Sequence, residues 1–229
     1  MKINNLLLST ALILLITSCQ KTEIIDNISA RPGLGIVRST IASVIIGEQV
    51  WSSKNLDVRI YKNDDTIPQV TDPTKWSNLT TGAWCWYNND SATYATTYGR
   101  LYNWYAVNDP RGLAPEGWHV PTHEEWDELE TCLGGSSVAG GAMKEEGLTH
   151  WNSPNTSATN SSGFAGLPGG YRGGSGAFGS VGDGGYWWSA SEYSIAFAWY
   201  RYLYYKNRRV GRDGGGKKAI GISVRIVRN

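Results

Sequence analysis

The sequence predicts a domain of short strands and long loops with one main helix, and three observations lead to this. Glycine contributes 28 of the 229 residues and tryptophan 11, whereas phenylalanine contributes 3 and methionine 2. Helical bundles are rich in leucine and alanine, so this composition favours large flat side chains packed among many turns. The other two observations are a helix-start motif at Thr122 and an alternating apolar stretch at residues 219–229.

The N-terminus has the pattern of an export signal. Lys2 precedes an apolar run over residues 6–16, which is too short to span a membrane. The run ends in "ITSC", closing at Cys19, and resembles the bacterial lipobox, in which the signal is cut before a cysteine that is then acylated. The alternative is an ordinary signal peptide with an incidental cysteine.

These features predict three parts of the chain. Residues 1–19 are expected to be a lipoprotein signal peptide, residues 20–40 a flexible tether and residues 41–229 the folded domain. Two acyl chains on Cys19 would anchor the protein stably in a membrane. We therefore expect a cell-envelope protein, lipid-anchored in the outer membrane on its periplasmic or cell-surface face.

The other two cysteines, Cys85 and Cys132, would lie in an oxidising compartment after export. A disulfide between them is possible, but Cys132 falls where a helix would bury it. Two separate buried thiols are the favoured expectation.

The first part of the domain is expected to form a hairpin followed by loops. The stretch "SVIIGEQVWSSKNLDVRIY", from Ser43, alternates around Gly47 as a hairpin does. Residues 62–82 are polar and contain Pro68 and Pro73, which favours a loop. Further on, the apolar spacing in "YGRLYNWYAV" indicates one short helix.

The helix-start motif lies in "GWHVPTHEEWDEL". Thr122 and Glu125 have the spacing of a capping box, and Trp126 begins an apolar face that continues to Leu129 and Leu133. Acidic residues in the first turns suit the positive end of the helix dipole, so they do not by themselves indicate acid–base catalysis. His119 precedes the cap and does not share the helix face of His123, which disfavours a metal site.

Glycine clusters alternate with aromatic residues between Gly163 and Glu192. The phosphate-binding spacing GxxxxGK[ST] is absent from the sequence, so these glycines favour tight turns and close contacts between strands. The final "AIGISVRIVRN" alternates apolar side chains with others, which predicts a strand over residues 219–229 that ties the chain end into the sheet.

Charge is divided unevenly along the chain. Residues 193–229 contain nine Lys or Arg and one acid, Asp213, whereas the first 192 residues contain twelve basic and nineteen acidic residues. The basic segment also carries six of the aromatic side chains between Phe197 and Tyr205. This combination predicts a surface of aromatic rings and cations near the C-terminus.

Six motifs together resemble a known family. They are "IGEQVWSSKNL", "YGRLYNWYAV", "PEGWHVPTHEEWDELE", "SGFAGLPGGYR", "YWWSASE" and "GISVRIVR". Their order over Ile45–Asn229 is similar to that of the Fibrobacter succinogenes major paralogous domain, a module of exported proteins and lipoproteins. That family looks like a distant relative of the C-type lectin and formylglycine-generating enzyme folds. The resemblance implies an α+β, C-type-lectin-like single domain with a twisted antiparallel sheet whose first and last strands meet.

The sequence departs from those relatives at their functional residues. No cysteine follows Cys132, so the paired catalytic cysteines of formylglycine-generating enzymes have no counterpart. In place of the calcium-binding turns of sugar-binding lectins, the chain has only "SPN" at residues 153–155 and "YNND" at residues 87–90. Many family members carry a cysteine in the closing strand, where this chain has Ile226. We therefore expect no metal, no cofactor and no enzyme activity of these kinds.

A second resemblance concerns Trp188–Asn229. This segment is similar to the variable C-terminal region of ligand-binding proteins that bacterial retroelements diversify, in which changeable side chains are displayed on a fixed backbone. That likeness implies recognition of a ligand by exposed polar and aromatic side chains.

These observations predict a lipid-anchored binding module that recognises a glycan or protein through an aromatic and basic C-terminal face. The candidate residues are Tyr193, Trp199, Tyr200, Tyr202, Tyr204, Asn207, Arg208, Arg209 and Arg212. A structural or assembly subunit of a surface structure is the alternative, and a carbohydrate-active enzyme using Asp183 and Glu192 is less favoured. Export argues against a nucleic-acid partner, and the lipid on Cys19 is the expected membrane contact.

Overall fold

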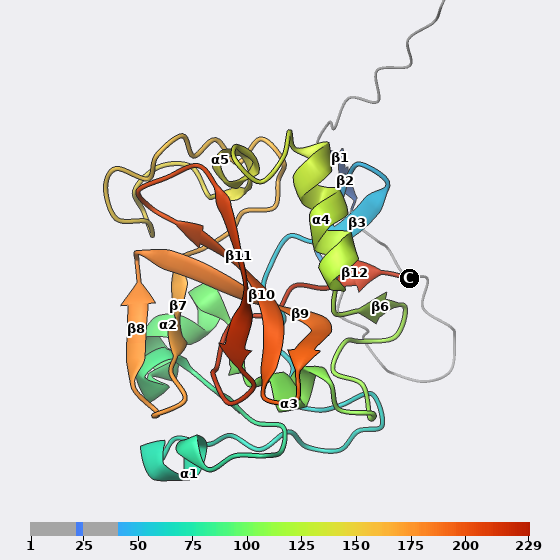
Figure 1. Cartoon of the computed structure of the whole chain (residues 1–229), viewed down its shortest axis with the longest axis vertical. Helices are drawn as coiled ribbons and strands as arrows, with labels where there is room; N and C mark the ends of the chain where they lie inside the picture. The colour runs from blue at the N-terminus through green and yellow to red at the C-terminus, as the bar shows by residue number, and fades with distance from the viewer. Residues whose placement is uncertain (1–21, 25–40) are drawn as a thin grey trace, which may run out of the picture.

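The computed structural model describes residues 22–24 and 41–229. Its largest sheet has five strands in the order β1-β2-β3-β12-β6 (Figure 1). These strands are β1 (Thr22–Ile24), β2 (Ser43–Ile46), β3 (Gln49–Ser52), β6 (Trp118–His119) and β12 (Val227–Arg228).

A second sheet has three long strands in the order β11-β10-β9. The other strands of the described residues form two two-stranded sheets. The long strands are β9 (Gly184–Ser194), β10 (Phe197–Tyr204) and β11 (Val210–Lys217). These small sheets pair β4 (Trp84–Cys85) with β5 (Leu101–Tyr102), and β7 (Gly169–Arg172) with β8 (Phe178–Val181). Pairing within all four sheets is antiparallel, and the mixture with helices is an α+β architecture.

The longest helix of the described residues, α4 (His123–Cys132), begins at the predicted capping box. Thr122 Oγ1 accepts the N–H of Glu125 at 3.2 Å, and the Glu125 carboxylate accepts the N–H of Thr122 at 2.8 Å. Trp126 packs against Trp51 of β3, with 4.7 Å between the ring centroids. The motif is therefore a helix start fixed to the core, as its residue pattern predicts.

The hairpin predicted at Gly47 is confirmed, with β2 and β3 joined by a turn in which Gly47 has a φ of 64°. The last strand, β12, pairs with β3 through Val227 and Trp51. The first hairpin of the domain and the end of the chain therefore meet in one sheet.

The C-terminal segment from Gly221 to Val227 runs through the middle of the molecule and joins its sheets. Its main chain forms bridges with Tyr102 of β5, Arg172 of β7 and Trp187 of β9 before β12 enters the large sheet. Every residue of this segment is buried. The prediction of one strand over residues 219–229 is wrong in its extent, because successive parts of the segment pair with different neighbours.

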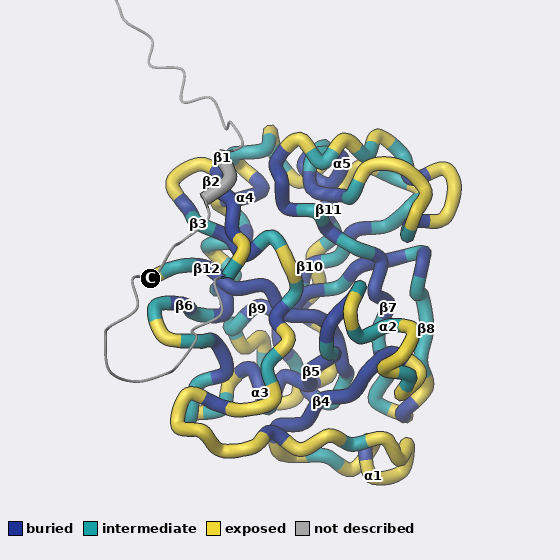
Figure 2. Tube along the Cα trace, turned by 180° about the vertical axis from the view of Figure 1, so that it is seen from behind, coloured by how far each residue is buried: buried dark blue, intermediate teal, exposed yellow. Residues whose placement is uncertain are grey.

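Alternate side chains of this segment enter two hydrophobic clusters. Ile222, Val224 and Ile226 belong to a first cluster, which contains Trp84, Trp86, Trp104, Trp118 and Trp188. Val227 belongs to a second cluster, which contains Trp51, Trp126, Trp151, Phe164 and Trp187. The segment thus contributes to both cores, while exposed residues gather in peripheral loops such as those beside α1 and α5 (Figure 2).

Several short helices lie where the sequence predicts loop or a different element. The polar stretch contains α1 (Pro73–Ser77), capped by the Asp72 side chain, and α2 (Ser91–Tyr98) is capped by Asp90. The helix predicted in "YGRLYNWYAV" is only α3 (Trp104–Val107), because residues 101–102 form β5 instead. The remaining short elements are α5 (Ala139–Met143) and a 3-10 turn at Tyr87–Asn89.

Cys85 is a buried free thiol, so the possible Cys85–Cys132 disulfide is not formed. Burial raises the pKa of the Cys85 thiol to about 12, which keeps it protonated and unreactive near neutral pH. The expectation of two separate buried thiols is confirmed for Cys85 only, because Cys132 is half-buried.

The prediction of a basic C-terminal surface is wrong for part of the segment. Arg201 and Arg225 are fully buried, and Lys218 is 8% exposed and pairs with Glu192. Arg225 donates to Ser52 O at 2.7 Å and lies over a phenylalanine ring. Several cations that the charge pattern predicts to lie on the surface are therefore buried and form hydrogen bonds or ion pairs inside the protein.

Some N-terminal expectations lie outside the described residues. These are the signal peptide, the lipid on Cys19 and most of the predicted tether. Three residues of that tether, Thr22–Ile24, form β1 and pair with β2. Within the described ranges, no helix combines the length and the apolar character that a membrane crossing requires.

We expect Arg225→Met to destabilise the protein by about 3–5 kcal/mol, because it removes the donor of three acceptors at buried or half-buried positions. These acceptors are Ser52 O, Asn55 Oδ1 and Ala165 O, at 2.7, 2.9 and 3.1 Å. Urea unfolding measures the change, with Arg59→Met, at an exposed position, as the control. Equal stability of the two variants would contradict a central role for Arg225.

Candidate functional site

The candidate recognition residues lie on β10 and its neighbours, and β10 presents its side chains to two sides of the sheet. Arg201 and Leu203 face α4 and the second hydrophobic cluster. Tyr200 and Tyr202 face the other way and contact the ring of Tyr186 on β9. This division follows from strand geometry, in which successive side chains point to opposite sides.

Five half-buried tyrosines lie on one side of the sheet, where Tyr171, Tyr186 and Tyr200 also pack against the first hydrophobic cluster, and we call this set the tyrosine face. Its members are Tyr171, Tyr186, Tyr200, Tyr202 and Tyr204. The centroid of the Tyr186 ring lies 5.4, 6.4 and 6.0 Å from those of Tyr171, Tyr200 and Tyr202. Tyr202 and Tyr186 are direct cross-strand partners, and their rings are stacked at 27°. Three strands, β7, β9 and β10, thus supply one aromatic surface.

Glycines of β11 make room for these rings. Gly211 is paired with Tyr202 across the strands, and a Cβ at Gly211 would overlap the Tyr202 ring. A Cβ at Gly216 would lie 2.8 Å from Cδ1 of Tyr200. The glycine-rich edge strand therefore lets the tyrosine rings lie flat against it, which fixes their orientation.

The hydroxyls of Tyr186 and Tyr200 stay protonated near neutral pH. Burial raises the pKa of Tyr200, and the Asp213 carboxylate, which accepts its hydroxyl at 3.3 Å, raises it further. Burial also raises the pKa of Tyr186. At these two positions the face therefore presents neutral hydroxyl groups that donate and accept hydrogen bonds beside flat apolar rings.

A second aromatic patch lies beside α4. The Trp199 ring contacts those of His123, at 4.3 Å, and Tyr193, at 5.0 Å. Burial lowers the pKa of His123, and the nearby Arg201 guanidinium lowers it further. The exposed Arg212 reaches the same helix and pairs with Asp127 at 3.3 Å.

The buried Arg201 ties β10 to α4 beneath this second patch. Its Nε donates to Glu130 Oε1 at 2.5 Å, and its Nη2 donates to Asp127 Oδ1 at 2.6 Å. Asp127, one of the acids that the sequence places in the first turns of the helix, is thus a partner of a buried cation.

The nine residues predicted from sequence do not form one surface. Tyr200, Tyr202 and Tyr204 belong to the tyrosine face, whereas Tyr193, Trp199 and Arg212 lie beside α4. Asn207, Arg208 and Arg209 lie in the β10–β11 loop. Sequence reasoning also missed Tyr171 and Tyr186, because only the strand register brings them beside β10.

Lys144 fixes the β10–β11 loop from inside. Its side chain is fully buried, and Nζ donates to the carbonyls of Thr156 and Asn207, each at 2.9 Å, and of Tyr204 at 3.4 Å. Burial lowers the pKa of Lys144 to about 8. The ammonium therefore replaces the hydrogen bonds that these loop carbonyls would otherwise make with water.

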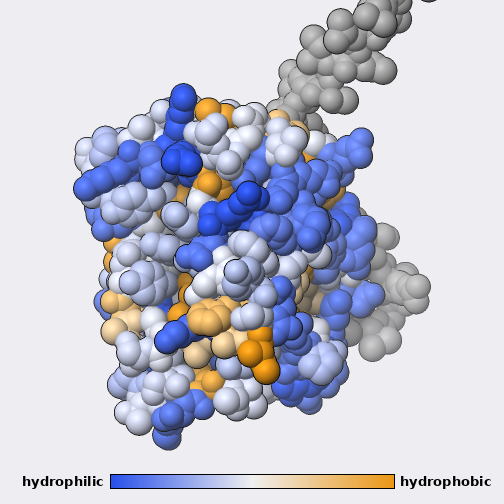
Figure 3. Space-filling view, viewed as in Figure 1, coloured by the Kyte–Doolittle hydropathy of each residue, from blue (hydrophilic) through white to orange (hydrophobic). Residues whose placement is uncertain are grey.

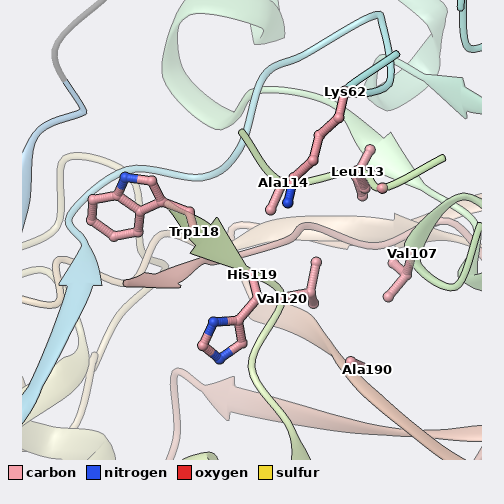
Figure 4. Close-up of a pocket in the computed structure, with 9 residues that line it drawn as sticks. Lys62, Val107, Leu113, Ala114, Trp118, His119, Val120 and Ala190 are labelled. Atoms are coloured by element: carbon pink, nitrogen blue, oxygen red, sulfur yellow. The ribbon is translucent and has the colours of Figure 1, made fainter. Parts of the chain in front are cut away.

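A separate pocket of about 200 Å³ lies near β6. It is lined mainly by apolar side chains, and Lys62 extends towards Ala114 at its edge (Figure 4). His119 also lines it, but both ring nitrogens are engaged at 2.7 Å, one by Glu125 and the other by Asn229. The pocket lining therefore offers no free pair of acid and base groups.

Asp183 and Glu192 do not form a paired acid site, and His119 and His123 do not form a metal site. Asp183 precedes β9 and accepts a hydrogen bond from Asn152, whereas Glu192 lies near the other end of β9 and pairs with Lys218. Glycosidase carboxyls lie within about 10 Å of each other. In the described part of the chain, no three His, Cys, Asp or Glu side chains gather as a metal site.

We expect Lys144→Met to lower the free energy of unfolding by about 1–3 kcal/mol near pH 7, because it leaves buried carbonyls unpaired. The gap to the unchanged protein should widen as the pH rises from about 8 towards 10.5, the ordinary value of the lysine pKa. In that interval the unfolded chain binds the Lys144 proton and the folded chain does not, so stability rises with pH. Denaturant unfolding at several pH values, with the exposed Lys54→Met as control, measures both effects. A gap that narrows over this interval would contradict the account.

Comparison with known proteins agrees with the resemblance of the motifs. No curated protein and no solved structure matches the chain. The family model described as the Fibrobacter succinogenes major domain matches residues 44–228. Because this match covers most of the sequence, the chain belongs to the Fibrobacter succinogenes major domain family.

Proposed function

We propose that this protein is a binding module of the cell envelope that recognises a glycan or protein ligand through the tyrosine face. The observation that carries the proposal is the chain of ring contacts through Tyr186, which joins four half-buried tyrosines into one aromatic surface. The opposite side of β10 is packed against α4 and the second hydrophobic cluster. The candidate site is accordingly narrower than the nine residues predicted from sequence, and it includes Tyr171 and Tyr186.

Tyrosine suits this role physically. A tyrosine ring supplies a large contact area and has few rotatable bonds, so little conformational entropy is lost when a ligand binds. Here the rings are already held by each other and by the β11 glycines. Such preorganisation favours binding because the cost of ordering the site has been met during folding.

The envelope location rests on the sequence. The apolar run ending in "ITSC" supports export and a lipid on Cys19. We also infer that the fold is C-type-lectin-like, which the meeting of β3 and β12 and the long loops between short elements support.

A role as an assembly subunit is the second candidate, and one observation favours it. Ile195, in the β9–β10 turn, is 93% exposed, and the neighbouring Tyr193 is 57% exposed. Figure 3 shows a small orange patch at the lower end of these strands, surrounded by more hydrophilic surface. An apolar side chain this exposed would suit a contact with another protein.

The proposed function predicts that Tyr186→Ser with Tyr202→Ser lowers affinity by roughly tenfold or more, since it removes the stacked centre of the face. Glycan and protein arrays with the full-length protein identify the ligand, and titration calorimetry measures its affinity. The control is Tyr193→Ser with Trp199→Ser, which removes the aromatic patch beside α4. Thermal melting must show that each variant is folded at the assay temperature. Loss of binding in the control alone would move the site to the other side of the sheet.

The envelope location predicts that Cys19 carries the lipid anchor. Cells supplied with labelled fatty acid should label the protein, and Cys19→Ala should abolish the label and release the protein from the membrane fraction. Cys85→Ala is the matched control, because that thiol is buried and free. Labelling that persists in Cys19→Ala would refute the lipid assignment.

A further inference from the structure

We propose that the β10–β11 loop, residues 205–209, is an anion-binding subsite that selects acidic glycans, meaning sugars that carry carboxylate or sulfate groups. This inference rests on the proposed function and names the ligand class of the same surface. The neighbouring tyrosine face would contact the sugar rings, and the loop would contact their charged groups.

The loop carries three exposed cations that form no ion pair within residues 41–229. These cations are Lys206, Arg208 and Arg209. Other arginines of the C-terminal segment behave differently, since Arg201 and Arg212 are paired with carboxylates of α4. The neighbouring Tyr205 and, more weakly, the Asp183 carboxylate raise the pKa of Lys206, so the charges of Arg208 and Arg209 are the ones most available to a ligand.

The loop backbone is held rigidly by contacts that do not use these side chains. The Tyr205 carbonyl accepts the N–H of Thr156 at 2.8 Å, and the Arg208 carbonyl accepts the N–H of Gly141 at 3.2 Å. Main-chain atoms of Arg209 lie so close to α5 that a side chain at Gly140 would overlap them. Together with the bond from Lys144 to Asn207, these contacts fix the positions from which the three cations project.

The cations also adjoin the aromatic surface. The ring of Tyr204, the last tyrosine of the face, lies 4.8 Å from that of Tyr205, and Lys206 Nζ lies 5.0 Å from the Tyr205 ring. Flat rings next to fixed cations match a ligand whose apolar ring faces alternate with negative groups. Guanidinium groups bind carboxylate and sulfate oxygens through paired hydrogen bonds, which neutral sugars cannot reproduce.

The test compares three forms of the full-length protein. The first has Lys206→Gln, Arg208→Gln and Arg209→Gln. The second keeps the three positive charges, with Lys206→Arg, Arg208→Lys and Arg209→Lys. The control removes three other exposed cations by Lys54→Gln, Arg59→Gln and Lys75→Gln. The probes are polygalacturonate, a sulfated glycan, a neutral glucan of similar length and an acidic polypeptide, and calorimetry measures binding.

We expect the glutamine loop variant to bind the acidic glycans roughly tenfold or more weakly, while the variant that keeps the positive charges binds more tightly than the glutamine variant and the control is unchanged. Raising salt from about 0.05 M to about 0.5 M should weaken binding of the unchanged protein and have less effect on the loop variant.

Equal binding of neutral and acidic glycans would overturn the subsite and leave the proposed function intact. Tight binding of the acidic polypeptide alone would overturn the glycan assignment. No binding of any probe or array ligand would refute both.

Discussion

The buried C-terminal segment, Gly221–Val227, is the constraint on which the rest of the structure depends. It contacts β5, β7 and β9 in turn and then continues into β12 between β3 and β6. Elements that are short by themselves, such as the two-residue β4, β5 and β6, are stabilised because they pack on or near this shared segment. A fold of this kind forms as a unit, since the segment that joins the sheets comes last in the chain.

Buried cations that bind main-chain carbonyls hold the long loops. Arg172, Lys144 and Arg225 are fully buried, and each donates to carbonyl oxygens of segments distant in sequence. Irregular backbone leaves carbonyls without the partners that a helix or sheet would provide, and an unpaired buried carbonyl is costly. A long cationic side chain can satisfy two or three of them at once. Aromatic rings also lie against these cations, for example Trp76 at 4.4 Å from Arg172.

Prediction from the sequence succeeds for local structure and fails for these buried cations. Local sequence signals predict structure correctly, because the capping box at Thr122 and the turn at Gly47 depend on residues close in the chain. The caps at Asp72 and Asp90 are local signals too, and they show that α1 and α2 were predictable from the same rules. By contrast, nothing local distinguishes the buried Arg225 from the exposed Arg212, because their partners lie on other elements.

The candidate site shows the same limit. Composition alone indicates that aromatic and basic residues gather near the C-terminus, but only register decides which of them share a surface. Alternation along β10 sends Tyr200 and Tyr202 to one side and Arg201 to the other, and it brings in Tyr186 from β9.

The arrangement also separates two tasks that one strand must perform. Side chains on the inner side of β10, such as Arg201 and Leu203, secure the sheet to α4 and to the core. Side chains on the outer side contact each other and the glycines of β11, and Tyr186 and Tyr200 also pack against the first hydrophobic cluster. Substitutions on the outer side therefore alter the recognition surface while the inner contacts that hold the backbone remain. A sheet of this design can present different aromatic and cationic surfaces without a change of fold, because Arg201 and Leu203 hold the strand to α4 and the second hydrophobic cluster from the opposite side.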